Sequence, residues 1–249
     1  MSFANRRVLI VGATSAIAQD VARILAGRGC AMVLAGRRAE RLEAVAADLR
    51  ARTATAVHLL EGDLAAIDGH DKLFSRAIAA AGGLDAVIVA YGVLGDQKEA
   101  AADFARGREI LDANFTSAAS WVSLAANLFE RQGSGHIVAI GSVAGDRGRK
   151  TNYFYGAAKG ALDLFLQGVR HRLAPKGIPV LCVKPGFVDT PMTAHIPKTP
   201  MFASPAEIAQ GIVAAMDSRK SVVYLPGKWR LVMFVLRNLP EFVFNKLNI

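Results

Sequence analysis

Short apolar runs alternate with longer amphipathic segments along the chain. The apolar runs predict strands at Arg7–Val11, Ala31–Ala35, Thr55–Leu60, Leu84–Ala90, His136–Ile140, Pro179–Val183 and Ser221–Leu225. The amphipathic segments predict helices at Ser15–Arg28, Ala39–Arg50, Asp68–Ala81, Gln97–Gln132, Tyr153–Ala174 and Ser204–Asp217. Short apolar strands separated by helices are typical of a parallel sheet that is covered on both faces. Because no linker rich in Pro, Gly or Ser divides the chain, we expect one α/β domain over residues 1–249 with a doubly wound sheet of about seven strands.

Composition excludes a disordered or fibrous protein, because 52% of the 249 residues are apolar and 20% are charged. The formal net charge of +9 suits nucleic acid, a membrane surface or a phosphorylated ligand. Nucleic acid is disfavoured, since the basic residues are scattered and seldom interleaved with aromatic ones. Cys30 and Cys182 have apolar neighbours and no metal-ligand spacing, so we expect buried thiols and no metal site.

The N-terminal residues MSFANRR lead directly into the first strand and predict no signal peptide. No apolar run reaches the ~18 residues that a bilayer span needs. We therefore expect a cytoplasmic protein, with a location at the inner face of the membrane left open.

The turn after the first strand contains small residues, in the order Gly12-Ala-Thr-Ser-Ala-Ile-Ala18. Small residues let backbone N–H groups and a helix N-terminus approach a pyrophosphate, although an ordinary tight turn has the same composition. The second strand ends in Gly36, Arg37 and Arg38, where an NAD-selective fold has an acidic residue. Guanidinium groups suit a 2′-phosphate, which favours NADP(H) over NAD(H), with two surface arginines as the alternative. Asp63 could accept a hydrogen bond from an adenine amino group.

The candidate catalytic residues are Ser142, Tyr155 and Lys159, which follow the fifth strand. Tyr155 and Lys159 are four residues apart on one predicted helix and therefore share a face. A nearby ammonium lowers the pKa of a tyrosine, so Tyr155 could protonate a carbonyl oxygen that the Ser142 hydroxyl holds. Asn114 could anchor a water that relays protons to Lys159. Each residue alone has an ordinary packing or surface role as its alternative.

With this Ser–Tyr-xxx-Lys arrangement and Pro185-Gly186 after the sixth strand, the chain resembles the short-chain dehydrogenase/reductase family over about Arg7–Val223. The resemblance implies a Rossmann-type fold, catalysis by Asn114, Ser142, Tyr155 and Lys159, and a homodimer or homotetramer formed through helices around Asn114–Arg131 and Tyr155–Ala174. It implies a dinucleotide site made of Gly12, Thr14, Ser15, Ala16, Ile17, Arg37, Arg38, Asp63, Leu64, Ala90, Gly92, Tyr155, Lys159, Pro185, Gly186, Val188 and Thr190. Two motifs depart from the family pattern: TGxxxGxG is Val11-Gly-Ala-Thr-Ser-Ala-Ile-Ala18 here, and Asn-Asn-Ala-Gly is Val89-Ala-Tyr-Gly92.

A narrower resemblance is to decaprenylphosphoryl-2-keto-β-D-erythro-pentose reductases. It rests on Ala90–Asp96 (AYGVLGD), Ala144–Lys150 (AGDRGRK), Tyr155-Gly156 and the ending Trp229-Arg230 to Arg237-Asn-Leu-Pro240. The resemblance implies reduction of the 2-keto group of a polyprenyl-phosphoryl pentose, a step of cell-wall or polysaccharide biosynthesis. A reductase of a simple lipid or small ketone, and a redox-inactive nucleotide-sensing protein, are the alternatives.

Candidate substrate residues lie in two segments, with Arg147, Arg149 and Lys150 before Tyr155, and Met192 and His195 in a proline-rich segment that follows the Pro-Gly turn. Clustered cations suit a phosphate, and the second segment has the composition of a lid. A solvated basic loop and an irregular connector are the alternatives.

The tail, residues 228–249, combines the apolar run Leu231–Leu236 with Trp229, Arg230 and Arg237. This composition suits an interfacial segment at an anionic membrane. Packing into a subunit interface, or over the substrate cleft, is the alternative.

Overall fold

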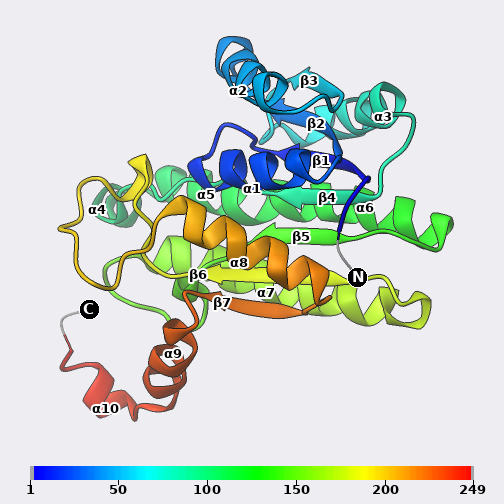
Figure 1. Cartoon of the computed structure of the whole chain (residues 1–249). Helices are drawn as coiled ribbons and strands as arrows, with labels where there is room; N and C mark the ends of the chain where they lie inside the picture. Colours follow the sequence, from blue (N-terminus) through cyan, green and yellow to red (C-terminus); the bar gives the residue numbers. More distant parts are fainter. Residues whose placement is uncertain (1–2, 248–249) are drawn as a thin grey trace.

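Seven parallel strands form one sheet in the order β3-β2-β1-β4-β5-β6-β7 (Figure 1). The computed structural model describes residues 3–247. The strands are β1 (Arg7–Val11), β2 (Ala31–Gly36), β3 (Val57–Glu61), β4 (Ala86–Val89), β5 (Ile137–Ile140), β6 (Val180–Pro185) and β7 (Val222–Leu225). The predicted Rossmann-type sheet is therefore confirmed.

Both faces of this sheet are buried, as the uninterrupted apolar runs predicted. In β1, Val8 and Ile10 belong to one hydrophobic cluster, and Leu9 and Val11 belong to the other. Helices α1, α2 and α8 contribute to the first cluster, and α3, α6 and α7 contribute to the second. Their bounds are α1 (Ala16–Gly27), α2 (Ala39–Arg52), α3 (His70–Ala81), α6 (Ser117–Gln132), α7 (Tyr153–Leu173) and α8 (Pro205–Asp217).

The strand order reverses at β1, which pairs with β2 on one side and with β4 on the other. The crossovers from β1 to β2 and from β4 to β5 thus leave in opposite directions, and a crevice opens outside the carboxyl ends of these strands. In Figure 1 this edge also carries the connection between β6 and α8, drawn in yellow.

The long helix predicted over Gln97–Gln132 is divided into shorter pieces. It consists of α4 (Gln97–Ala102), α5 (Phe104–Leu111), a π-helical turn (Asp112–Thr116) and α6. The break falls at Asp103, whose extended backbone and carboxylate cap α5 by accepting a hydrogen bond from Ala105 N. The alanine-rich composition concealed this break, because alanine favours a continuous helix.

The tail after β7 forms two further helices, α9 (Lys228–Asn238) and α10 (Glu241–Phe244). They lie beyond β7 at the side of the main body (Figure 1). One face of α9 is buried, with Trp229 5% exposed and Met233 3% exposed. Leu231 and Phe234 on the same helix are 69% and 65% exposed. Within residues 3–247, no helix combines the length and the hydropathy that crossing a membrane requires.

Candidate active site

A cleft of about 900 Å³ lies along the carboxyl edge of the sheet. All of the residues assigned above to the dinucleotide line this cleft, from Gly12 to Thr190 in sequence. Ser142, Tyr155 and Lys159 line it as well. The fold thus brings the two predicted sets of residues into one continuous site.

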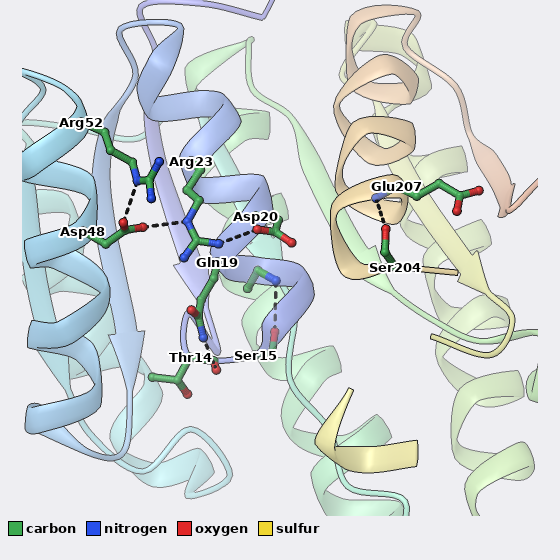
Figure 2. Close-up of polar contacts among 10 residues, drawn as sticks. Thr14, Ser15, Gln19, Asp20, Arg23, Asp48, Arg52, Ser204 and Glu207 are labelled. Carbon is green, nitrogen blue, oxygen red and sulfur yellow. Dashed lines mark hydrogen bonds and ion pairs between the residues drawn. The ribbon is translucent and has the colours of Figure 1, made fainter. Parts of the chain in front are cut away.

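The first turn is shaped to bring backbone close to a ligand. Gly12 has φ of +89°, and a Cβ there would lie 2.6 Å from Tyr91 Cβ, so the site requires glycine. Ser15 caps α1 by accepting a hydrogen bond from Ala18 N at 3.3 Å, and Gln19 Nε2 donates to Thr14 O at 3.0 Å (Figure 2). The N-terminus of α1 therefore faces the cleft in a fixed position, as pyrophosphate binding demands.

Ion pairs fix α1 against α2 behind this turn. The Arg23 guanidinium binds Asp48 at 2.7 Å and Asp20 at 2.5 Å, and Arg52 also binds Asp48 (Figure 2). The arginines hold the pKa of Asp48 below its usual value. These contacts hold the two helices whose starts border the nucleotide end of the cleft.

Three arginines border the cleft after β2. Arg37, Arg38 and Arg41 line it, and none of them makes a salt bridge with a carboxylate among residues 3–247. Gly36 takes the position of the acidic residue typical of NAD-selective folds, and a Cβ there would lie 3.0 Å from Leu42 Cδ2. The donor set present here fits a phosphate on the adenosine ribose.

The Leu64 carbonyl fixes the loop after β3. It accepts hydrogen bonds from His70 Nε2 at 3.0 Å, Tyr91 OH at 2.9 Å and Trp121 Nε1 at 3.2 Å. Burial lowers the pKa of His70 and so favours its neutral form. In this loop Asp63 uses one carboxylate oxygen to accept from Ala65 N at 3.0 Å. Tyr91, one of the departures from the family motif, thus helps to fix the loop that carries Asp63.

Tyr155 and Lys159 share one face of α7, with Lys159 Nζ 5.8 Å from the centre of the Tyr155 ring. Lys159 Nζ donates to Ile140 O at 2.9 Å, which anchors the ammonium at the end of β5. Ser142 follows the same strand, and its hydroxyl accepts from Ala144 N at 3.1 Å. The end of β5 and the start of α7 therefore position all three side chains.

Burial dominates the electrostatics of this pair. It raises the pKa of Tyr155, against smaller lowering effects of Ser142 and Arg149. It lowers the pKa of Lys159 to about 8. The expected lowering of the tyrosine pKa by the ammonium is therefore not the leading effect, and Tyr155 remains a protonated phenol, the form that can donate a proton.

Asn114 was expected to anchor a water, and that role stays a prediction. The residue is fully buried and does not line the cleft. Its Oδ1 accepts from Val93 N at 3.2 Å, and its Nδ2 donates to Val93 O at 2.7 Å and to Ile110 O at 2.8 Å. These bonds occupy the side-chain amide, which holds the segment after β4 against the π-helical turn.

Two glycines let the Ser142 loop touch α7. A Cβ at Gly145 would lie 2.6 Å from Gly160 N, and one at Gly160 would lie 2.9 Å from Gly145 O. The same loop is also held by an ion pair, since buried Lys184 of β6 binds Asp146 at 2.6 Å and Asp163 of α7 at 2.9 Å. The loop that carries Ser142 is therefore fixed to both β6 and α7.

The three basic residues expected to bind substrate take different positions relative to the cleft. Arg149 lines the cleft, whereas Arg147 and Lys150 do not. Arg147 Nη1 instead donates to Leu236 O at 2.5 Å and Leu239 O at 2.7 Å, and its guanidinium lies 3.8 Å from the centre of the Phe244 ring. The loop turns Arg147 toward the tail and leaves Lys150 exposed outside the cleft, so this geometry gives their predicted contact with substrate no support.

The lid candidates Met192 and His195 do line the cleft. Sequence reasoning did not assign Gln97, Asn152 or Trp229 to the site, and all three line it too. Trp229 reaches the cleft because Gly186 has no side chain: a Cβ there would collide with the indole ring. The tail thus covers part of the cleft, one of the alternatives considered for it. Within the described part of the chain, no group of three or more His, Cys, Asp or Glu residues could hold a metal ion.

A doubly wound sheet whose carboxyl edge brings Ser142, Tyr155 and Lys159 into one cleft is typical of Rossmann-type oxidoreductases. The short chain dehydrogenase family matches residues 6–200. The chain therefore belongs to the short-chain dehydrogenase/reductase family, whose members use NAD(P)(H).

Similar proteins match this chain over almost its whole length. An uncharacterized oxidoreductase of Mycobacterium tuberculosis is 36% identical over 240 residues, which are 96% of each chain. An uncharacterized oxidoreductase of Streptomyces coelicolor is 32% identical over 97% of this chain and 96% of its own.

Solved structures show the same fold. Levodione reductase has a TM-score of 0.83 at 23% identity, over 92% of this chain and 99% of its own. A short-chain dehydrogenase from Sphingobium yanoikuyae in complex with NADPH has a TM-score of 0.82 at 26% identity, over 95% of this chain and 97% of its own.

Proposed function

We propose that this protein reduces a ketone to a secondary alcohol with NADPH. The observation that carries the proposal is that Ser142, Tyr155 and Lys159 line the same cleft as the residues assigned to the dinucleotide. Bound NADPH supplies the hydride. Tyr155 donates its phenolic proton to the carbonyl oxygen, and the Ser142 hydroxyl hydrogen-bonds to that oxygen and holds it. Lys159, as a cation, stabilises the phenolate that remains.

The preference for NADP(H) is supported by Arg37, Arg38 and Arg41. Their guanidinium groups border the end of β2, where no carboxylate would repel a phosphate. The solved relative with NADPH is consistent with this preference.

For the substrate, we propose the 2-keto group of a polyprenyl-phosphoryl pentose, in the biosynthesis of a cell wall or polysaccharide. Arg149 beside Tyr155 supports an anionic substrate, as does the narrower sequence resemblance described above. A simple lipid or small ketone remains the competing substrate. A redox-inactive nucleotide sensor would have no need of the assembled Ser142, Tyr155 and Lys159.

Contact with an anionic membrane is part of the same proposal. The outer face of α9 exposes Leu231, Phe234 and Val235 beside a groove that contains Arg230 and Arg237. Apolar side chains flanked by cations suit the boundary of anionic headgroups. A lipid-linked substrate could pass from such a surface to the cleft on the opposite, buried face of the helix. We keep the homodimer or homotetramer formed by the helices around Asn114–Arg131 and Tyr155–Ala174 as a prediction.

The deciding experiment is NADPH oxidation, followed by absorbance, with a prenyl-phosphoryl ketopentose and with a simple cyclic ketone. We expect the ketopentose to be reduced with the higher kcat/KM. Equal rates, or a faster simple ketone, would select the competing substrate class. No oxidation with any ketone in a panel would select the sensor.

The membrane contact has its own test, co-sedimentation with phosphatidylglycerol vesicles. We expect salt-sensitive binding that is lost in a Leu231→Ser, Phe234→Ser double variant, because these exposed side chains can change without disturbing Trp229. Equal binding by this variant and the wild type would contradict the contact.

A further inference from the structure

A buried lysine in β6 has no role in the reaction described so far. The strand has the sequence VLCVKP, and its lysine, Lys184, is 5% exposed. The Lys184 Nζ donates to Asp146 Oδ1 at 2.6 Å and to Asp163 Oδ2 at 2.9 Å. An ammonium buried without partners is costly, so the two carboxylates are what allows a cation at this position in the strand.

The Asp146 carboxylate connects this ammonium to Ser142 by a short path. Both carboxylate oxygens have donors, since Lys184 binds Oδ1 and Tyr224 OH donates to Oδ2 at 2.7 Å. A single 3₁₀ turn separates Asp146 from Ser142, and Gly145 N donates to Ser142 O at 3.2 Å within it. A shift of the carboxylate would therefore move the segment that carries the Ser142 hydroxyl.

The Asp163 carboxylate connects the same ammonium to α7. Tyr155, Lys159 and Asp163 follow one another at intervals of four residues and share one face of this helix. Lys184 itself directly precedes Pro185, which lines the cleft and is among the residues assigned to the dinucleotide. One ammonium thus ties together the loop after β5, the helix that carries the proton donor and the end of β6.

The proposed reaction requires these three segments to be aligned. The hydride has to reach the carbon whose oxygen Tyr155 protonates and Ser142 holds, so the redox end of the nucleotide must lie beside these two side chains. Pro185 and Gly186 contribute to the wall of the cleft directly after Lys184. Because a misplacement of about 1 Å can lower a rate by about 10²-fold, a rigid connection between these segments matters for turnover.

The charge of Lys184 suits a fixed connection and not proton transfer. Burial lowers the pKa of Lys184, but the hydrogen bonds to Asp146 and Asp163 outweigh burial, so the pKa lies above its usual value. Lys159 donates to a backbone carbonyl instead, and burial lowers its pKa to about 8. Lys184 therefore stays a cation over the pH range in which Lys159 loses its charge.

We propose that Lys184 is a positioning residue: through Asp146 and Asp163 it holds Ser142 and Tyr155 in alignment with the end of β6. The proposal rests on the function proposed above for the reaction that this alignment serves. Stability alone is a poor reason for such a group, because the desolvation of a buried ion pair offsets most of its attraction. Its fixed directions are what an apolar side chain of the same volume would not supply.

The test compares steady-state kinetics and NADPH binding for the wild type, Lys184→Met and Lys184→Arg. We expect Lys184→Met to lower kcat by up to about 10²-fold, and Lys184→Arg, which keeps the cation, to restore part of the loss. The affinity for NADPH should stay close to that of the wild type, because Arg37 and Arg38 are not part of this network. The pH at which kcat/KM declines should not move in either variant, because Lys159 sets it.

A control separates positioning from a general loss of stability. Arg7→Met also breaks an ion pair, with Asp85 at 2.9 Å, but at the amino end of β1, and neither residue lines the cleft. We expect Arg7→Met to keep the wild-type kcat. Thermal unfolding is measured for every variant, since removing Lys184 leaves two buried carboxylates without their ammonium. If Lys184→Met does not fold, Asp146→Asn takes its place, because it removes the charge of the loop carboxylate and keeps its size.

The outcomes separate the role of Lys184 from the reaction. A wild-type kcat in Lys184→Met, or in Asp146→Asn where that replaces it, would overturn the role even if a ketone is reduced. An equal fall of kcat in Arg7→Met would overturn it too.

If the wild type reduces no ketone, the fluorescence emission of bound NADPH decides, because it reports the surroundings of the nicotinamide. An emission that changes in Lys184→Met, or in Asp146→Asn where that replaces it, and is restored in Lys184→Arg would support the positioning role and overturn the proposed reaction. An unchanged emission would overturn both.

Discussion

The two ends of the cleft are built in different ways. The nucleotide end uses the carboxyl ends of β1 to β4 and the capped start of α1, and its supporting groups are paired, as with Ser15, Gln19 and the Leu64 carbonyl. The substrate end uses loops and the start of the C-terminal helix, with Arg149, His195 and Trp229 among its lining residues. The sheet topology dictates the first end, whereas the second depends on the path of these loops and on where the tail packs. The nucleotide end therefore follows from the fold alone, and the substrate end does not.

The largest effect on activity should come from a change at Tyr155, where the two ends of the cleft meet. Tyr155→Phe removes only a hydroxyl, and we expect kcat to fall by about 10²–10⁴-fold, the usual contribution of general acid catalysis. Steady-state kinetics with the preferred ketone measures it, with circular dichroism as the folding control. Turnover close to that of the wild type would remove Tyr155 from its role.

Removing a positive charge at the nucleotide end should change the affinity for the nucleotide. Arg37→Ala should weaken NADPH relative to NADH by about 1.5–3 kcal/mol, because a charged hydrogen bond to the 2′-phosphate is lost. Fluorescence titration with both nucleotides measures the difference. An equal loss for NADPH and NADH, or a wild type that prefers NADH, would contradict the proposed preference.

At the substrate end, Gly186→Ala should displace Trp229 and destabilise the fold by about 1–3 kcal/mol, since an added methyl group collides with the indole. Gly168→Ala is the matched control, because nothing lies within 4 Å of a Cβ at that position on α7. Thermal unfolding compares the two. If Gly186→Ala is as stable as the control, Trp229 is not held in the cleft wall as described.

The smallest effect concerns pH. The pKa of Lys159 is about 8, below its usual value, because of burial. Its cationic fraction therefore falls as the pH rises through about 8, and kcat/KM for reduction should fall by up to about tenfold per pH unit beyond it. Lys159→Arg keeps the cation and should move the decline to higher pH. A profile of the wild type without a decline up to about pH 9.5 would show that the ammonium is not needed.

The pattern of apolar runs was sufficient to predict the sheet, because strands buried on both faces leave a strong signal in the sequence. Ser142, Tyr155 and Lys159 were predictable for a related reason: two are one helical turn apart, and the third follows a strand that ends at the same edge. The break at Asp103 was not predictable from periodicity, since alanine on both sides favours an uninterrupted helix.

The substrate end was only partly predictable, because it depends on backbone direction and distant contacts. Arg147, Arg149 and Lys150 have the same charge within four positions, and only the path of the loop decides which one enters the cleft. Trp229 comes long after Ser142 in sequence, and it reaches the site only because Gly186 has no side chain in the space that the indole occupies. Spacing alone does not reveal such a contact.

The position of Trp229 has a consequence for how this enzyme could change over evolutionary time. The family match ends at residue 200, and α9 comes after it, yet this helix supplies one wall of the cleft. Arg147 donates hydrogen bonds to the Leu236 and Leu239 carbonyls and so holds the far end of this helix. Changes confined to this segment would therefore reshape one wall of the cleft while Ser142, Tyr155 and Lys159 keep their places, so substrate choice and hydride chemistry can vary separately.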